Sequence, residues 1–238
     1  MPRAYRARSP WRPIRAIVAT LLIYFSGVWA LSAVISFDKT LRGMGRPEGL
    51  WREDVATLLT VGVWQLVTIA LTIAVSALGR GRVKDVLALR PPAGGLRMYA
   101  VAIVMTVLLQ VVIVVVTPWL FPAPAQAQPE ATALLGDRWW VALLVIGLGA
   151  PLAEEFLFRG FLLSALVRPW GFWLSACLTN AWWTFLHAGY SVAGFTSVFA
   201  MGLLYSWQLW RSGSLRVPLL CHAVHNGLII VVFGQLSI

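Results

Sequence analysis

Charged side chains are scarce in this chain of 238 residues, because Asp, Glu, Lys and Arg together make up only 12% of it. A soluble domain carries roughly 25%, whereas 59% of the residues here are hydrophobic and the mean hydropathy is +0.78. This composition excludes a soluble protein and predicts that lipid is part of the solvent. The net charge of +10 comes from basic residues beside apolar runs. There they set topology and contact anionic lipid, so we predict no nucleic-acid partner.

Cysteine is nearly absent, and several catalytic signatures are missing. Cys177 and Cys221 both lie inside apolar segments, which excludes a disulfide framework and a zinc ribbon. The chain has no Gly-x-Ser-x-Gly, His-Glu-x-x-His or Walker A motif, so serine hydrolysis, thermolysin-like zinc chemistry and ATP-driven transport lack their usual signatures. No segment alternates in the way a barrel strand does, which leaves helices as the spanning form.

Long apolar runs are what the chain does have. A helix needs about 20 apolar residues to cross a bilayer. Seven segments approach this length, with boundaries uncertain by several residues: 14–37, 55–79, 98–121, 139–167, 171–187, 192–210 and 215–236. We therefore expect an all-α polytopic bundle of about seven spans, with six to eight as the range. The first run is too long for a signal peptide, so we interpret it as a retained helix.

Basic residues are distributed unevenly between the two sides that these spans define. Thirteen Lys and Arg fall in segments on the side of the N-terminus, and five fall on the other side. This bias predicts a protein integral to the cell membrane with its N-terminus inside. Residues 79–98 then form a basic inside connector, interpreted as a short helix lying on anionic lipid. Residues 120–138 are expected to be an irregular outside loop.

Ionisable residues inside a span are costly, so each one is a functional hypothesis. Glu154, Glu155 and Arg159 lie within the fourth segment, and His187 ends the fifth. The seventh segment contains three more polar residues, His222, His225 and Asn226. All three histidines of the chain belong to this set.

Helical spacing predicts which of these side chains pair. Glu155 and Arg159 share a face and can form an ion pair, whereas Glu154 is turned about 100° away and stays free to face a cavity. The alternative is that these residues form an ion-pair network that only stabilises the bundle, but one Arg balances one carboxylate and Glu154 would then have no role. His222 and Asn226 also share a face. Asn226 can therefore set the tautomer of His222 or help to hold an oxyanion. His225 points elsewhere and is expected to pack or to form an interhelical hydrogen bond.

A carboxylate and imidazoles in one apolar cavity suit the attack of water on a peptide carbonyl. The carboxylate can act as general base, and the imidazoles can donate to a developing oxyanion. Both kinds of group can instead hold a divalent metal such as zinc. Residue types alone leave the glutamate and metalloprotease alternatives open, and the candidate metal ligands are Glu154, His187 and His222.

At these residues the chain resembles the CPBP family of intramembrane endopeptidases, related to type II CAAX prenyl proteases and to bacteriocin-processing or immunity proteins. Three motifs carry the resemblance: EEFLFR at 154–159, WTFLH at 183–187 and HAVHN at 222–226. VLALRPP at 86–92 and the stretch 211–226 also look like the family, and the resemblance covers about residues 86–232. In the second motif Trp183 replaces the usual Phe, and we expect it to keep an aromatic packing surface.

The resemblance implies an active site. It implies Glu154 as the base that activates water, with Glu155 and Arg159 in support and His187, His222 and Asn226 completing the site. We therefore expect residues 1–85 to hold a basic segment and two generic spans, and residues 86–238 to form the protease core. The candidate catalytic residues are Glu154, Glu155, His187, His222 and Asn226, supported by Arg159.

The predicted function is an intramembrane endopeptidase that acts on a membrane-associated, lipid-modified or unmodified peptide or protein. The alternatives are a catalytically silent scaffold or immunity factor that binds a partner peptide, and a proton-coupled transporter. The transporter lacks visible inverted repeats. The predicted positions of two histidines across the membrane disagree. His187 lies far from the inside end of its span, whereas His222 lies close to the inside end of its span. The two can meet only if a span is tilted or begins below the surface, or if residues 211–218 dip inward.

Overall fold

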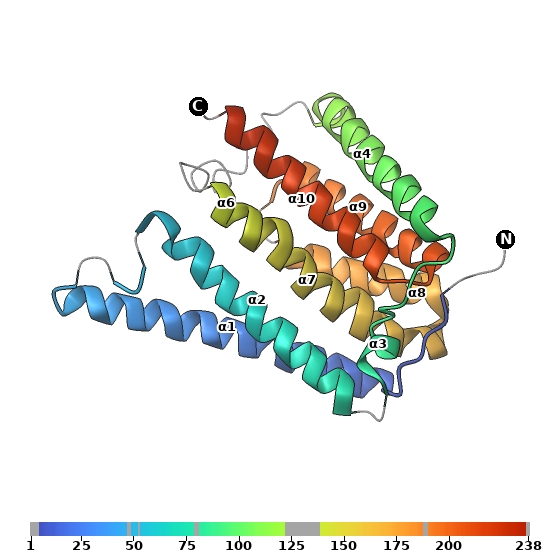
Figure 1. Cartoon of the computed structure of the whole chain (residues 1–238), viewed down its shortest axis with the longest axis horizontal. Helices are drawn as coiled ribbons and strands as arrows, with labels where there is room; N and C mark the ends of the chain where they lie inside the picture. Colours follow the sequence, from blue (N-terminus) through green and yellow to red (C-terminus); the bar gives the residue numbers. More distant parts are fainter. Residues whose placement is uncertain are drawn as a thin grey trace.

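The computed structural model describes residues 5–46, 49–51, 53–78, 81–121, 139–187 and 190–236. It is a bundle of long helices, without strands in this described part of the chain (Figure 1). The predicted loop at 120–138 falls almost entirely outside the described residues.

Two N-terminal helices pack against each other along their length. Helix α1 spans Pro13–Gly43 and α2 spans Glu53–Leu78, and they lie side by side in Figure 1. The contact is close at Gly27, where an added Cβ would lie 2.6 Å from the Trp64 ring. Hydroxyls inside α1 and other helices donate to carbonyls one turn back, as Ser32 does to Val28 at 2.9 Å. This pairing satisfies their polarity without water.

A central helix runs from Trp139 through the middle of the bundle. It consists of α6 (Trp139–Ala142), a π-helical segment η1 (Leu143–Gly149), α7 (Ala150–Glu154) and a second π-helical segment η2 (Glu155–Leu162). Helix α2 contacts it on one side and α10 (Arg216–Leu236) on another. Every residue of η2 is buried, so the central helix is surrounded by protein rather than by lipid there.

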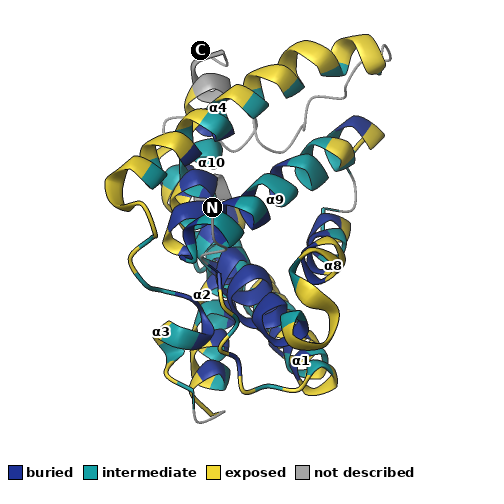
Figure 2. Cartoon of the chain, turned by 90° about the vertical axis from the view of Figure 1, so that its right-hand side faces the viewer, coloured by how far each residue is buried: buried dark blue, intermediate teal, exposed yellow. Residues whose placement is uncertain are grey.

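Three further long helices complete the bundle. Helix α8 (Leu163–Phe185) follows η2 directly and is broken at Gly171, whose φ of 73° is not helical. Helix α9 (Val192–Ser212) begins with the Ser191 side chain accepting from the Gly194 N–H, and it ends at the left-handed Gly213. Helix α4 (Gly95–Leu120) lies at the outside and is mostly exposed (Figure 2). Most of its exposed residues are apolar, as expected for a face in contact with lipid.

These helices confirm the predicted polytopic helical bundle. Five stretches of the described chain are long and apolar enough to cross a membrane, and one of them, Trp139–Phe185, has 47 residues and contains the break at Gly171. It therefore covers two predicted spans, 139–167 and 171–187. The predicted span 215–236 appears as α10.

The connector between α2 and α4 differs from its predicted position on the lipid surface. It forms only one helical turn, α3 (Val83–Val86), and the following Leu87 is fully buried. The Ala88 carbonyl accepts from the Leu215 N–H at 2.9 Å, and the Ala93 N–H donates to the Ser212 carbonyl at 2.8 Å. The short amphipathic pattern was misread because its apolar side faces the base of α10 instead of lipid.

Candidate active site

Glu154 is the last residue of α7 and lies between the two π-helical segments. Short π-helical insertions widen a helix locally and are frequent at functional sites. Here they flank the Glu-Glu pair on both sides. The two neighbouring carboxylates point into different surroundings.

Glu155 faces the protein interior and forms the predicted ion pair. Its Oε1 lies 3.0 Å from Arg159 Nη1, and both side chains are completely buried. The guanidinium also donates to Asn180 Oδ1 at 3.1 Å, and the Asn180 amide donates to the Phe199 carbonyl at 2.9 Å. Such additional hydrogen bonds help a buried pair to be tolerated, but Glu155 Oε2 and Arg159 Nε are buried without a hydrogen-bond partner in the described part of the chain.

Glu154 faces a pocket, as its rotation relative to Glu155 predicts. Its Oε2 accepts a hydrogen bond from the Trp183 indole N–H at 2.6 Å. The same oxygen lies 3.8 Å from His222 Nε2. The Glu154 side chain is 15% exposed, whereas that of Glu155 is not exposed at all. Glu154 is therefore the carboxylate of the pair that a substrate can reach.

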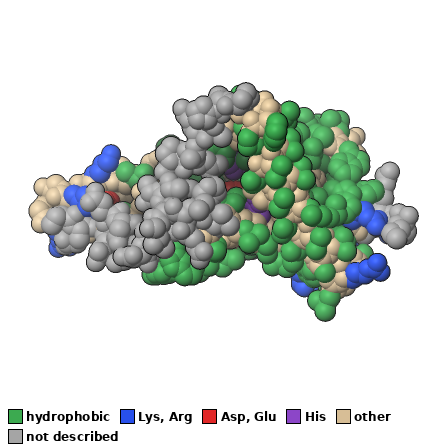
Figure 3. Space-filling view, turned by 90° about the horizontal axis from the view of Figure 1, so that it is seen from above, with side chains coloured by type: hydrophobic (Ala, Val, Ile, Leu, Met, Phe, Trp, Pro, Cys, Tyr) green, Lys and Arg blue, Asp and Glu red, His purple; other side chains and the backbone are tan. Residues whose placement is uncertain are grey.

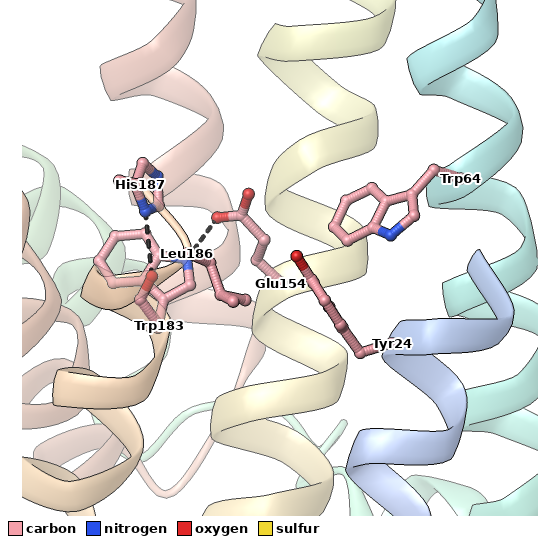
Figure 4. Close-up of a pocket in the computed structure, with 6 residues that line it drawn as sticks. All are labelled: Tyr24, Trp64, Glu154, Trp183, Leu186 and His187. Carbon is pink, nitrogen blue, oxygen red and sulfur yellow. Dashed lines mark hydrogen bonds between the residues drawn. The ribbon is translucent and has the colours of Figure 1, made fainter. Parts of the chain in front are cut away.

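The pocket has a volume of about 240 Å³ and lies between three parts of the bundle. Its lining combines two ionisable residues with aromatic and apolar ones: Tyr24, Trp64, Glu154, Trp183, Leu186 and His187. Figure 4 shows the Glu154 carboxylate between His187 and Trp183 on one side and the two N-terminal aromatic rings on the other. In the space-filling view, carboxylate and histidine atoms are visible in a recess among hydrophobic side chains (Figure 3).

His222 bridges the two carboxylates from α10. Its Nδ1 lies 3.0 Å from Glu155 Oε1, an oxygen that also accepts from Arg159. An ionised carboxylate only accepts, so Nδ1 carries the hydrogen and Nε2 is directed toward Glu154. The Tyr205 ring stacks on the imidazole with centroids 4.9 Å apart. Glu155 thus orients His222.

Asn226 does not hold His222, contrary to one predicted role. Its side-chain amide donates to the Ile146 carbonyl at 2.9 Å and so attaches α10 to η1. The prediction relied on the shared face of two residues on one helix, but a neighbouring helix offers the nearer acceptor. His225 lies off this face, and its Nδ1 is buried without a hydrogen-bond partner in the described part of the chain.

His187 enters the pocket from the C-terminal end of α8. Its Nδ1 lies 3.0 Å from the Trp183 carbonyl. A carbonyl only accepts, so this nitrogen carries the hydrogen and the free position is Nε2. The ring also makes an edge contact with Trp183, with centroids 5.0 Å apart. The imidazole is thereby oriented by its own helix.

The two histidines meet around Trp183, as a common site requires. The Trp183 ring contacts both imidazoles, and its centroid lies 5.6 Å from that of His222. Helix α10 begins inside the bundle, because Ser214 and Leu215 immediately before it are fully buried.

The described side chains do not form a metal site. No group of three His, Cys, Asp or Glu residues in this part of the chain is placed to hold one ion. His222 Nε2 is 3.8 Å from Glu154 Oε2, and His222 does not line the pocket that Glu154 and His187 share. The candidate ligands Glu154, His187 and His222 therefore do not fit a common metal ion in this geometry.

Several residues at the site were not found by sequence reasoning. Tyr24 and Trp64 come from the N-terminal helices, which the resemblance did not cover. Tyr205 stacks on His222 and carries no signal in the sequence that marks it. Asn180 had a detectable signal, because it is an amide inside a predicted span and such residues are expensive there.

Comparison with known proteins supports the assignment of the C-terminal part. Residues 136–228 match the family model described as type II CAAX prenyl endopeptidase Rce1-like. An uncharacterized 24.3 kDa protein of Escherichia coli is 35% identical over 103 residues, which are 40% of this chain and 48% of that protein. The chain thus spans about half the length of this curated relative. No solved structure matches. Residues 136–228, which contain all three motifs and the pocket's Glu154 and His187, are therefore similar to the Rce1-like type II CAAX prenyl endopeptidases.

Proposed function

We propose that the protein is an intramembrane endopeptidase in which Glu154 activates the attacking water. The observation that carries this proposal is the different environment of two adjacent carboxylates. Glu155 is paired with Arg159 at 3.0 Å, whereas Glu154 lines a pocket together with His187. A carboxylate that is not neutralised by its own ion pair can accept a proton from water.

The reaction needs one water and one proton acceptor. Glu154 takes a proton from the water as the water oxygen bonds to the peptide carbonyl carbon. The resulting tetrahedral intermediate breaks its C–N bond, and Glu154 returns the proton to the leaving nitrogen. The products are a carboxyl terminus and an amine, and Glu154 ends in its starting state.

The histidines have separate parts in this proposal. His187 uses Nδ1 on the Trp183 carbonyl, so Nε2 is the atom left for the substrate. A neutral ring holds the water there through its lone pair, and a protonated ring donates to the oxyanion. His222 lies behind the pocket, where its hydrogen bond to Glu155 holds its Nε2 3.8 Å from Glu154 Oε2.

The substrate we propose is a peptide that reaches the pocket from the membrane. Tyr24, Trp64 and Leu186 make much of the lining apolar. The description of the matching family names prenyl endopeptidases, which suggests a lipid-modified peptide. We also propose that the N-terminus is inside, from the excess of basic residues on that side. Protease accessibility of a terminal tag in oriented vesicles tests this orientation.

The test replaces Glu154 by Gln, which keeps the shape of the side chain but removes the base. Purified protein in liposomes is given a fluorescent CAAX-type peptide, with and without a farnesyl group. We expect a fall in cleavage of about 10²- to 10⁴-fold, the usual contribution of a general base. Asp85→Asn is the matched control, since Asp85 pairs with Arg8 and Arg90 away from the pocket.

The outcomes separate the candidate functions. Cleavage that persists within tenfold in Glu154→Gln contradicts the proposal. If neither peptide is cleaved, membranes that contain wild type or Glu154→Gln are compared by peptide profiling, and identical profiles favour a silent scaffold. Metal content measured on the same preparation distinguishes a glutamate mechanism from a metal-assisted one.

A further inference from the structure

We propose that Trp183 is a positioning residue, whose indole N–H holds the Glu154 carboxylate in the orientation needed for attack. This inference rests on the proposed function, because it concerns the same base. The sequence suggested only an aromatic packing surface at this position. The structure adds a polar contact that a phenyl ring cannot make.

The contact is a short hydrogen bond to a carboxylate oxygen. Trp183 Nε1 lies 2.6 Å from Glu154 Oε2. Hydrogen bonds to ionised groups are short and roughly twice as strong as neutral ones. The Trp183 side chain is only 3% exposed, so water has little access to replace this acceptor. A buried indole N–H without a partner would lose its hydrogen bond to water and gain none in return, which favours keeping the contact.

The indole itself is held in place on several sides. The Arg159 guanidinium lies over the ring, 4.2 Å from its centroid. The imidazoles of His187 and His222 make edge contacts with the indole, and their ring centroids lie 5.0 and 5.6 Å from its own. Because the Arg159 guanidinium is anchored by Glu155, the donor is tied to the buried ion pair. The position of the Glu155 carboxylate thus influences that of the Glu154 carboxylate through Trp183.

The two carboxylate oxygens of Glu154 differ in their hydrogen-bond partners. Oε2 accepts from Trp183 and is the oxygen nearest to His222. Oε1 accepts no hydrogen bond from any residue in the described part of the chain. The carboxylate therefore has one oxygen held by protein and one available to water in the pocket. Misplacement of a reacting group by about 1 Å can cost 10²-fold in rate.

The test compares Trp183→Phe with Trp182→Phe. Trp182 is the adjacent residue, and its ring packs on Phe158 with centroids 6.0 Å apart, so the control removes an indole from the same helix. In the liposome assay with the farnesylated peptide, we expect Trp183→Phe to lower kcat about 10- to 100-fold with KM within about twofold. Trp182→Phe should leave kcat within about twofold. A kcat for Trp183→Phe equal to that of the control overturns the proposal.

Two additional measurements keep the inference independent of folding and of the proposed function. Benzothienylalanine at position 183 keeps the two-ring shape but lacks the N–H, and it should reproduce the fall in kcat. In ¹H–¹⁵N spectra, the Trp183 indole proton should lie downfield and move upfield in Glu154→Gln. Full kcat with benzothienylalanine, or an indole signal unchanged in Glu154→Gln, overturns the inference. If Glu154→Gln remains active while that signal moves, the proposed function fails and the contact stands.

Discussion

Replacing Glu155 by Gln tests how strongly the buried ion pair stabilises the bundle. The substitution keeps the side-chain shape but leaves the Arg159 guanidinium without its counter-charge. Both side chains are completely buried and their atoms are 3.0 Å apart, so water cannot screen the remaining charge. Its other close contacts, Asn180 and the Trp183 ring, are neutral. Removing one partner of a buried pair costs about 3–5 kcal/mol.

This cost corresponds to a fall in the ratio of folded to unfolded protein of about a hundredfold to several thousandfold. The chain contains a suitable reporter, because the Cys221 thiol is buried and Cys177 is exposed. In a Cys177→Ser background, labelling of Cys221 by a thiol-reactive dye measures opening of the bundle. The protein is titrated with SDS in mixed micelles, and the midpoint should fall sharply for Glu155→Gln.

The double variant Glu155→Gln with Arg159→Met shows whether the unpaired charge causes the loss. Replacing both members of a buried pair is often nearly neutral, so the double variant should recover about 2 kcal/mol or more relative to Glu155→Gln. If the effects of the two substitutions simply add, the reasoning is refuted. The loss would then come from packing or from the hydrogen bonds, not from charge.

Two further changes follow from close contacts and are measured with the same thiol assay. Gly202→Ala should destabilise by about 1–3 kcal/mol, because the new Cβ would lie 1.7 Å from Asn180 Oδ1. Gly43→Ala is its neutral control, because no atom of the described residues lies within 4 Å of the new Cβ, and equal effects would contradict the packing argument. Asn226→Ala should cost about 0.5–1.5 kcal/mol by removing the hydrogen bond to the Ile146 carbonyl, and it should slow cleavage by loosening η1. Unchanged stability would show that this bond does not anchor α10.

Much of the helical architecture was predictable because spanning a membrane imposes a local requirement. A segment of about 20 apolar residues must be helical, since its backbone polar groups have no water to bind. The apolar runs therefore marked the long helices, including the two parts of Trp139–Phe185 that meet near Gly171. The connector after α2 was misread, because a short amphipathic pattern does not show whether its apolar side meets lipid or protein.

The pairing of side chains was predictable within one helix but not between helices. Glu155 and Arg159 pair as their spacing predicts, because both positions move together with the helix. Asn226 was assigned to His222 by the same rule, yet its amide binds Ile146 of another helix. The rotation of α10 against η1 decides this, and no spacing along either segment records it.

Composition and spacing thus establish that this chain is a helical membrane protein with a few costly ionisable groups, and that one of its two adjacent carboxylates is paired. These properties follow from hydropathy and from the 3.6-residue turn, which act over short stretches of chain. The contacts from Trp183 to Glu154 and from His222 to Glu155, and the closing of the pocket by Tyr24 and Trp64, arise only when separate helices pack. They depend on distances of a few ångströms between residues far apart in sequence, which are set by how side chains fill the whole interior.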